Sequence, residues 1–348
     1  MASLTPRENF MRVLNGQIPE WVPEFAYPGP PMFRKGGEQP DAWLFALSDL
    51  LGTRFAPVDP KDIWGVPFVA VEEVGGFQLP TPDVFILEDV TKWPEVIKVP
   101  ERLLELDWAA AAEAEMAALP FDRSKTTIFF APQMWAGYFM TFTNFMGFTE
   151  GLSAFVEEPD AVKELFDYVH QFYMMVYRKV LDVIKPDVIS LGDDVATEHN
   201  PFISPAMYRE FLIPFYRDYS ALAIERGISI EMHICGRAED FMHDLVKIGV
   251  NAWEPSQLSN NWEALQQRYG RHLVMASGWE GRGRLTELDV TDEEIRQSVR
   301  DAMDKYGKNG GYMWGGSYTP GSTNDLLTLH WNSVLRDEVY EYGGKLYK

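Results

Sequence analysis

A histidine and the only cysteine of the chain stand two residues apart, at His233 and Cys235, directly after the strand-like stretch ISIEM. Side chains alternate with a period of two along an extended segment, so the imidazole and the thiol point to the same side. Zinc accepts nitrogen and sulfur together, and a catalytic zinc takes three protein ligands and leaves one position open. We expect Glu254, which follows the next strand-like residues NAW, to be the third ligand.

Two adjacent carboxylic acids, Asp193 and Asp194, follow the stretch VISLG. Because neighbouring side chains point in different directions, at most one of them aims at the same space as the histidine and the cysteine. A carboxyl group in a poorly hydrated aromatic pocket has a raised pKa and can donate a proton at neutral pH. We predict that one of the two is a catalytic acid, and a local cap or salt bridge is the alternative.

Aromatic and polar side chains at other strand ends are candidates for holding a substrate. The stretch 134–148 is dense in aromatic residues and methionine directly after a strand-like segment. Over the mouth of a site it would form a soft apolar wall for an aryl ligand or a flat macrocycle, and core packing is the alternative. The predicted substrate-binding residues are Gln133, Trp135, Tyr138, Trp279, Glu280, Trp314 and Tyr318.

The elements that position these side chains alternate along the chain. Helical apolar spacing marks 159–184, and capping signals start further helices at Ser204-Pro205 and at Thr291 with Glu294. Alternating strands and helices imply a parallel sheet, and seven or eight strands favour closure into a (β/α)₈ TIM-type barrel, with function at the C-terminal strand ends. Strands are expected near 22–26 and at 126–131, 188–191, 229–234, 250–254, 273–277 and 312–314.

The N-terminal region reads as an extension to this barrel. Thr5, Pro6 and Glu8 form a capping box that starts a helix, which we expect to plug the bottom or side of the barrel. Short strand-like pieces over 64–77 flank Gly75-Gly76 and predict a hairpin. We therefore predict one domain over 1–348, with the helical and hairpin extension in 1–100 and regular alternation in 101–348.

Composition limits the class of partner. The formal charge of −21 argues against nucleic acid and anionic membranes, which require a basic surface. The polar N-terminus does not resemble a secretory signal, no apolar run is long enough to span a membrane, and one cysteine forms no intrachain disulfide, so we expect a soluble cytoplasmic protein. The Gly281-Arg282-Gly283 run is not a nucleotide-binding fingerprint. Assembly into a homo-oligomer stays open.

Four stretches carry a resemblance to a known family: LTPRENFMRVLNGQIPEWVP, LGDDVATEHNPFISPAMYREFLIPFY, EMHICG and GRLTELDVTDEEIRQSVRDAMDKYGKNGGYMWGG. The sequence resembles the uroporphyrinogen decarboxylase superfamily almost end to end, and within it the corrinoid-dependent methyltransferases. The resemblance implies a (β/α)₈ barrel. True decarboxylases carry an arginine-rich segment near the N-terminus, whereas the corresponding stretch here is WVPEFAYPGPPMF, so decarboxylation of a porphyrinogen is not expected.

Within that superfamily, the segment 233–236 looks like the H-x-C-G zinc motif of methylcobamide-dependent methyltransferases, and Glu254 matches a glutamate ligand of cobalamin-independent methionine synthase. Their further cysteine, from the last strand, is missing here, where WGGSY stands at 314–318. Fewer sulfur ligands leave a harder, more electrophilic metal, which suits an oxygen ligand. This departure points away from a thiol-methylating enzyme and towards the methyltransferase I components of ether-cleaving O-demethylases, which the chain resembles.

That resemblance implies an enzyme that moves a methyl group from a small-molecule O-methyl donor, a phenyl methyl ether, to the cob(I)alamin carried by a separate corrinoid protein. Zinc on His233, Cys235 and Glu254 would polarise the ether oxygen, or Asp193 or Asp194 would protonate it. The alternatives are a corrinoid methyltransferase acting on an amine, a thioether or a thiol, a decarboxylase of a small acid, and a non-catalytic corrinoid-binding barrel.

Overall fold

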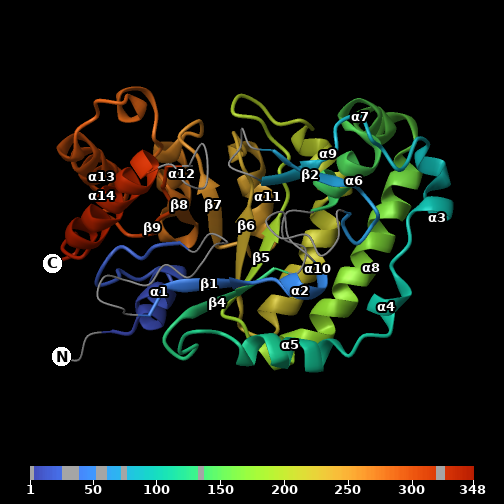
Figure 1. Cartoon of the computed structure of the whole chain (residues 1–348), viewed down its shortest axis with the longest axis horizontal. Coiled ribbons are helices and arrows are strands. Elements are labelled where there is room, and N and C mark those ends of the chain that lie inside the picture. Colours follow the sequence, from blue (N-terminus) through green and yellow to red (C-terminus); the bar gives the residue numbers. More distant parts are fainter. Residues whose placement is uncertain (1–3, 26–38, 52–60, 72–76, 132–136, 319–325) are drawn as a thin grey trace.

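The computed structural model describes residues 4–25, 39–51, 61–71, 77–131, 137–318 and 326–348 (Figure 1). Its centre is a sheet of seven parallel strands in the order β1-β4-β5-β6-β7-β8-β9. These strands are β1 (Ala42–Phe45), β4 (Thr127–Phe130), β5 (Val188–Gly192), β6 (Ser229–His233), β7 (Ala252–Ser256), β8 (Val274–Ser277) and β9 (Tyr312–Trp314). The strands of this sheet therefore pair in the order in which they follow along the chain, as they do in a curled barrel sheet.

The two ends of this sheet meet through the segment before residue 26. Glu24 forms a parallel bridge with Trp314, and the amide of Phe25 donates to the Trp314 carbonyl at 2.7 Å. On the other side, the carboxylate of Asp41, the residue before β1, accepts the amide of Glu24 at 3.0 Å. Of the strand predicted near 22–26, the described residues show a single bridge at Glu24, which stands between β9 and β1, while residue 26 lies outside the described residues. The predicted TIM-type barrel is confirmed.

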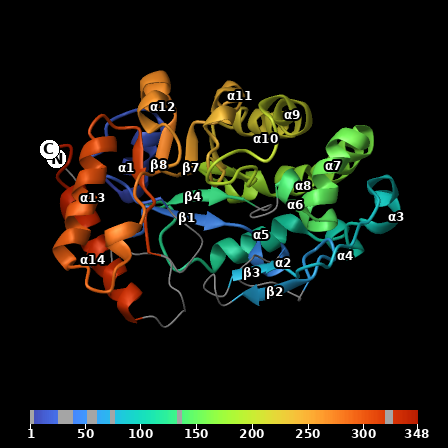
Figure 2. The same cartoon turned by 90° about the horizontal axis from the view of Figure 1, so that it is seen from above.

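Helices surround the strands, with α13 and α14 at one end of the molecule and α6 to α8 at the other (Figures 1 and 2). The longer helices are α1 (Pro6–Leu14), α5 (Trp108–Ala117), α6 (Tyr138–Met146), α7 (Phe148–Glu157), α8 (Pro159–Ile184), α9 (Pro205–Phe211), α10 (Ile213–Ile224), α11 (Met242–Lys247), α12 (Trp262–Tyr269), α13 (Asp292–Tyr306) and α14 (Leu326–Gly343). Three single-turn helices are α2 (Ser48–Leu51), α3 (Trp93–Val96) and α4 (Glu101–Leu104).

The helix starts that the sequence predicts are confirmed. Capping boxes join Thr5 to Glu8 at α1 and Thr291 to Glu294 at α13, and Ser204 caps α9 by accepting the amide of Met207 at 3.2 Å. The helix predicted over 159–184 is α8, with the same ends. Its apolar residues fall on one face because they recur every three or four positions, which is the period of a helix packed against a sheet.

Helix α1 lies at the N-terminal ends of the strands, as expected for a plug. Its Phe10, Val13 and Leu14 are buried in one cluster with inward side chains of the barrel, among them Phe129 and Val188. Arg7 forms an ion pair with Asp187, the residue that precedes β5. A second and larger hydrophobic cluster fills the space between the strands and the surrounding helices. The bottom of the barrel is thereby filled, and the opposite end holds the polar strand ends.

Two elements in the N-terminal region add detail to the prediction. The hairpin is present as the antiparallel strands β2 (Phe68–Val71) and β3 (Phe77–Pro80), while its Gly75-Gly76 turn lies outside the described residues. Strand β1 belongs to the barrel sheet although it lies in the stretch that we interpreted as an extension. Four apolar residues give no reliable period, which explains why this strand was missed. No helix in the described ranges is long and apolar enough to cross a membrane.

Candidate metal centre

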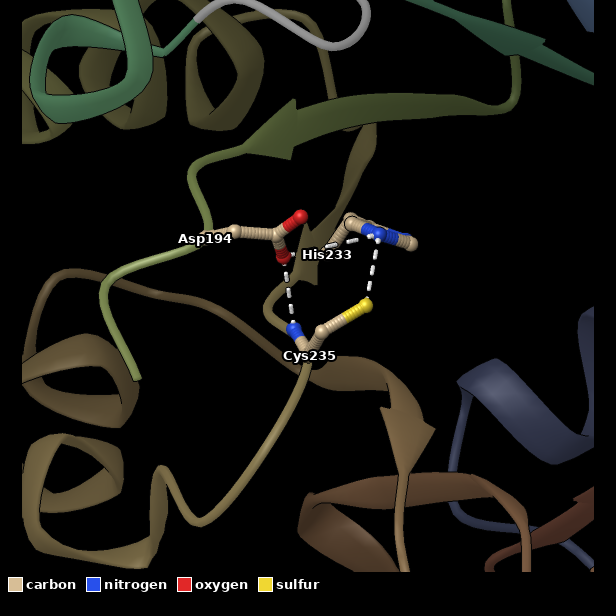
Figure 3. Close-up of side chains that lie close together, drawn as sticks. All are labelled: Asp194, His233 and Cys235. Carbon is tan, nitrogen blue, oxygen red and sulfur yellow. Dashed lines mark hydrogen bonds and ion pairs between the residues drawn. The ribbon is translucent and has the colours of Figure 1, made fainter. Parts of the chain in front are cut away.

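Asp194, His233 and Cys235 gather at the C-terminal ends of β5 and β6 (Figure 3). One ligand atom from each lies within 4.8 Å of the others. The Nε2 atom of His233 is 3.5 Å from Sγ of Cys235 and 3.9 Å from Oδ1 of Asp194. All three residues are partly exposed.

The donor set and spacing of this cluster fit a divalent metal. Tetrahedral zinc has Zn–N near 2.0 Å and Zn–S near 2.3 Å, which together place nitrogen and sulfur about 3.5 Å apart. The His233–Cys235 separation of 3.5 Å matches that edge. Asp194 supplies an oxygen at the third corner, so the residues present can hold zinc through one nitrogen, one sulfur and one oxygen and leave a position open.

Glu254 lies behind the histidine and not in this cluster. Its Oε2 is 2.7 Å from Nδ1 of His233, on the opposite side of the ring from Nε2, and its side chain is buried. The register explains this position, because β6 and β7 pair His233 with Glu254. The two side chains therefore stand side by side inside the barrel. The sequence predicts Glu254 as the third ligand. In the structure it is Asp194 that lies in the cluster with His233 and Cys235, while Glu254 contacts Nδ1 of His233.

Cys235 is the sulfur donor of the three. Burial raises the pKa of its thiol above the ordinary value, and the nearby imidazole of His233 opposes that rise. The backbone amide of Cys235 donates to Oδ1 of Asp194 at 2.8 Å. The carboxylate of Asp194 thus both faces the cluster and ties the turn after β6 to the end of β5.

The neighbouring carboxylate of Asp193 turns the other way. It accepts the amides of Phe139 and Met140, both at 2.9 Å, and the hydroxyl of Tyr216 at 2.6 Å. The side chain is buried, and burial raises its pKa to about 7. Of the two candidate acids, Asp194 is therefore the one at the cluster, and Asp193 caps the first turn of α6 from a neighbouring strand.

Glu231 is a buried acid beneath the cluster that the sequence reasoning missed. It is fully enclosed, its carboxylate accepts the hydroxyl of Ser190, and burial raises its pKa well above the ordinary value. Glu231 stands two residues before His233 on β6, so the alternation of a strand also places it inside the barrel. That spacing was the available signal, but one carboxylate within an apolar stretch does not reveal which face is inward.

Of the first three predicted substrate-binding residues, the structure describes only Tyr138. Gln133 and Trp135 lie outside the described residues. Tyr138 is buried between helices, where its hydroxyl lies 2.6 Å from Nδ1 of His170 on α8 and donates to the hydroxyl of Tyr219 on α10 at 3.0 Å. Its ring therefore fills the helical layer, and contact with a substrate stays a prediction.

Trp279, Trp314 and Tyr318 form an aromatic group at the end of β9 and in the loops after β8 and β9. The Trp279 ring lies 5.9 Å from Trp314 and 5.1 Å from Tyr318 between ring centres, and its indole nitrogen donates to Ser298 on α13. All three are nearly enclosed. Glu280 binds Arg282 and accepts the amide of Leu258 at 2.8 Å, so it joins the loops after β7 and β8. Substrate contact by these four residues stays a prediction.

Comparison with known proteins supports the barrel. A methyltransferase from Methanosarcina mazei has a similar fold, with a TM-score of 0.61 at 14% sequence identity, and the likeness covers 97% of this chain and all of that one. A 3-keto-L-gulonate-6-phosphate decarboxylase from Vibrio cholerae is much more distant, with a TM-score of 0.29 at 8% identity over 67% of this chain and 79% of that chain. No curated protein matches the sequence.

One family model matches the sequence directly. It is described as uroporphyrinogen decarboxylase (URO-D) and it matches residues 126–317, from the start of β4 to the residues after β9. The matched part contains every residue of the cluster and more than half of the chain. On this evidence the chain belongs to the uroporphyrinogen decarboxylase family.

Proposed function

We propose that this protein is a metal-dependent methyltransferase that moves a methyl group from an O-methyl substrate, a phenyl methyl ether, to the cob(I)alamin of a separate corrinoid protein. The observation that carries the proposal is the cluster of Asp194, His233 and Cys235 at the mouth of a family barrel. A single sulfur among three ligands leaves a harder metal than two sulfurs would, and a harder metal prefers an oxygen of the substrate. That preference favours an ether over a thiol.

Each of the three residues has a distinct task in holding zinc. His233 offers Nε2, while Asp194 and Cys235 offer a carboxylate and a thiolate, both of which must be deprotonated to bind. When bound, the metal supplies a Lewis acid that polarises the ether oxygen, which makes a phenolate a better leaving group. The protein's contribution is to keep the three ligand atoms on one side and one position free for the substrate.

Glu254 orients the imidazole in this account. Metal-binding histidines commonly donate the second ring N–H to a carboxylate, which fixes the tautomer and raises the basicity of the ligating nitrogen. The 2.7 Å contact between Nδ1 and Glu254 meets this requirement. With the proton on Nδ1, the lone pair of Nε2 faces Asp194 and Cys235. We therefore propose Glu254 as an orienting residue in place of the ligand that the sequence predicted.

The test is an anaerobic assay of methyl transfer. Zinc-loaded protein is mixed with cob(I)alamin and a panel of methoxyarenes, and methylcobalamin is followed by its absorbance. We expect substrate-dependent formation of methylcobalamin that is lost in Asp194→Ala and Cys235→Ala. Asp122→Ala is the matched control, because Asp122 is an exposed carboxylate with local partners, the amide and hydroxyl of Ser124 and the ammonium of Lys125.

The outcomes separate the proposal from the other functions. Activity with methylamines or methyl thioethers but not with ethers would show that the methyl donor is not an ether. Release of carbon dioxide from a small acid would show that the protein is a decarboxylase and not a methyltransferase. Binding of the corrinoid without methyl transfer from any donor would show a non-catalytic barrel.

A further inference from the structure

The backbone amides of the turn that carries Cys235 are bound by groups outside the turn. Its consecutive backbone amides, from Cys235 to Glu239, each donate to a residue of the loop after β5 or the loop after β7. The acceptors, in chain order of the donors, are Oδ1 of Asp194, Oε1 of Gln257, the carbonyl of Thr197, and Oδ1 of Asn260 for the last two amides. The turn therefore takes its shape from its two neighbours.

Asn260 makes the largest share of these contacts. Its Oδ1 accepts the amides of Ala238 at 2.9 Å and Glu239 at 3.0 Å. Its Nδ2 donates to the carbonyls of Gly236 at 2.9 Å and Gln257 at 3.0 Å. An asparagine side chain has two donors and two acceptor lone pairs, so its hydrogen-bonding capacity is fully used. The side chain is only 6% exposed, which makes each of these bonds costly to lose.

The opposite side of the turn is closed by close packing. Gly236 has φ of +83°, and a Cβ atom there would lie 2.4 Å from the carbonyl oxygen of Thr197. The loop after β5 therefore rests directly on the backbone of the turn. With Thr197 on one side and Asn260 on the other, the backbone next to Cys235 has one arrangement, and that arrangement places Sγ 3.5 Å from Nε2 of His233.

We propose that Asn260, assisted by Gln257, is a positioning residue that fixes the Cys235 thiol at the cluster before any metal binds. The proposal rests on the metal site of the proposed function, and it names two residues outside the cluster of Asp194, His233 and Cys235. A preorganised ligand binds more tightly, because less conformational freedom is lost when the metal arrives. Removing a residue that orients a ligand commonly lowers metal affinity about 10- to 100-fold.

The experiment compares Asn260→Ala with Asn9→Ala. Asn9 is also buried, and it also bridges backbone groups, since its Nδ2 donates to Trp21 at 3.0 Å and its Oδ1 accepts Glu20 at 2.7 Å. It lies on α1, at the end of the barrel opposite the cluster. Both variants should lose thermal stability, so Asn9→Ala controls for destabilisation alone. Gln257→Ala is a milder second variant, because Gln257 Oε1 accepts one amide of the turn.

Two readouts are measured, each at a fixed interval below the melting temperature of the variant. The first is zinc affinity by competition with a chromophoric chelator. The second is the rate at which iodoacetamide alkylates the metal-free protein, which reports on Cys235 alone because the chain has no other cysteine. We expect Asn260→Ala to lower zinc affinity at least tenfold and to raise the alkylation rate several-fold, with a smaller change in the same direction for Gln257→Ala.

The result that overturns the proposal is an Asn260→Ala variant that matches Asn9→Ala in both readouts. If Asn260→Ala does not fold, Gln257→Ala decides in the same way, by exceeding or matching Asn9→Ala. A wild-type protein that binds no zinc would refute the metal site. The alkylation rates would then still show whether Asn260 positions the thiol, so the two failures are distinguishable.

Discussion

At the scale of single residues, the surroundings of a side chain decide its role more than its type does. Asp193 and Asp194 are adjacent and chemically identical. Asp193 is enclosed by two amides of α6 and the hydroxyl of Tyr216, whereas Asp194 faces His233 and Cys235. The sequence predicts that only one can face the site, because successive side chains diverge. It does not tell which, since that depends on where β5 ends.

The role of Glu254 gives the first prediction. If Glu254 orients His233, Glu254→Gln should lower zinc affinity about 10- to 100-fold and leave one zinc bound per chain at high concentration. Asp194→Ala removes a ligand and should lower the affinity further. Competition titration with a chelator measures both variants. A Glu254→Gln protein that loses more affinity than Asp194→Ala would restore Glu254 as a ligand.

At the scale of elements, the strand register does most of the positioning. Pairing of β6 with β7 sets His233 beside Glu254, and pairing of β5 with β6 sets Gly192 beside His233. The sequence predicts these strands well because each is apolar and followed by polar residues. It does not predict which ring nitrogen Glu254 reaches, because that depends on the rotation of the imidazole. Strand β1 was missed because Ala42–Phe45 is too short to show a period.

The link between β5 and α6 gives the second prediction. A Cβ atom on Gly137 would lie 2.3 Å from Cγ of Asp193, so the start of α6 rests directly on this carboxylate. Asp193→Ala leaves the amides of Phe139 and Met140 without their acceptor. We expect the free energy of unfolding to fall by about 2 to 4 kcal/mol. Urea unfolding measures it.

The same variant tests whether Asp193 has a part in the chemistry. Because its carboxylate points away from the cluster, zinc affinity in Asp193→Ala should change less than in Asp194→Ala. A stable Asp193→Ala protein with unchanged zinc affinity and unchanged methyl transfer would show that Asp193 is structural, whereas abolished methyl transfer would support the catalytic role that the sequence predicts.

At the scale of the whole molecule, closure of the barrel brings the cluster to one mouth. The alternation of strands and helices predicted the barrel, and the capping box at Thr5 predicted the helix that fills its bottom. A strand near 22–26 and closure of the barrel were predicted, but the side-chain contacts at the join between the sheet ends were not. They are made by Asp41, which accepts the amide N–H of Glu24 at 3.0 Å and the indole N–H of Trp21 at 3.3 Å. These partners come together only in the folded chain, so no local pattern marks them.

That join gives the third prediction. Asp41 is 4% exposed, so Asp41→Ala removes a buried carboxylate that accepts the amide of Glu24 and the indole nitrogen of Trp21. We expect the free energy of unfolding to fall by about 2 to 4 kcal/mol. The exposed Asp122→Ala serves as control and should change it by less than about 1 kcal/mol. Equal effects of the two variants in urea unfolding would refute the importance of Asp41 for closure.

The central claim is that Asp194, His233 and Cys235 bind one metal ion together. X-ray absorption at the zinc edge of the zinc-loaded protein tests it most directly, because the spectrum reports the type and distance of each ligand atom. The account predicts one sulfur near 2.3 Å and nitrogen or oxygen neighbours near 2.0 to 2.1 Å. Cys235→Ala should lose the sulfur signal. A wild-type spectrum without sulfur, or a protein that retains no zinc, would contradict the account.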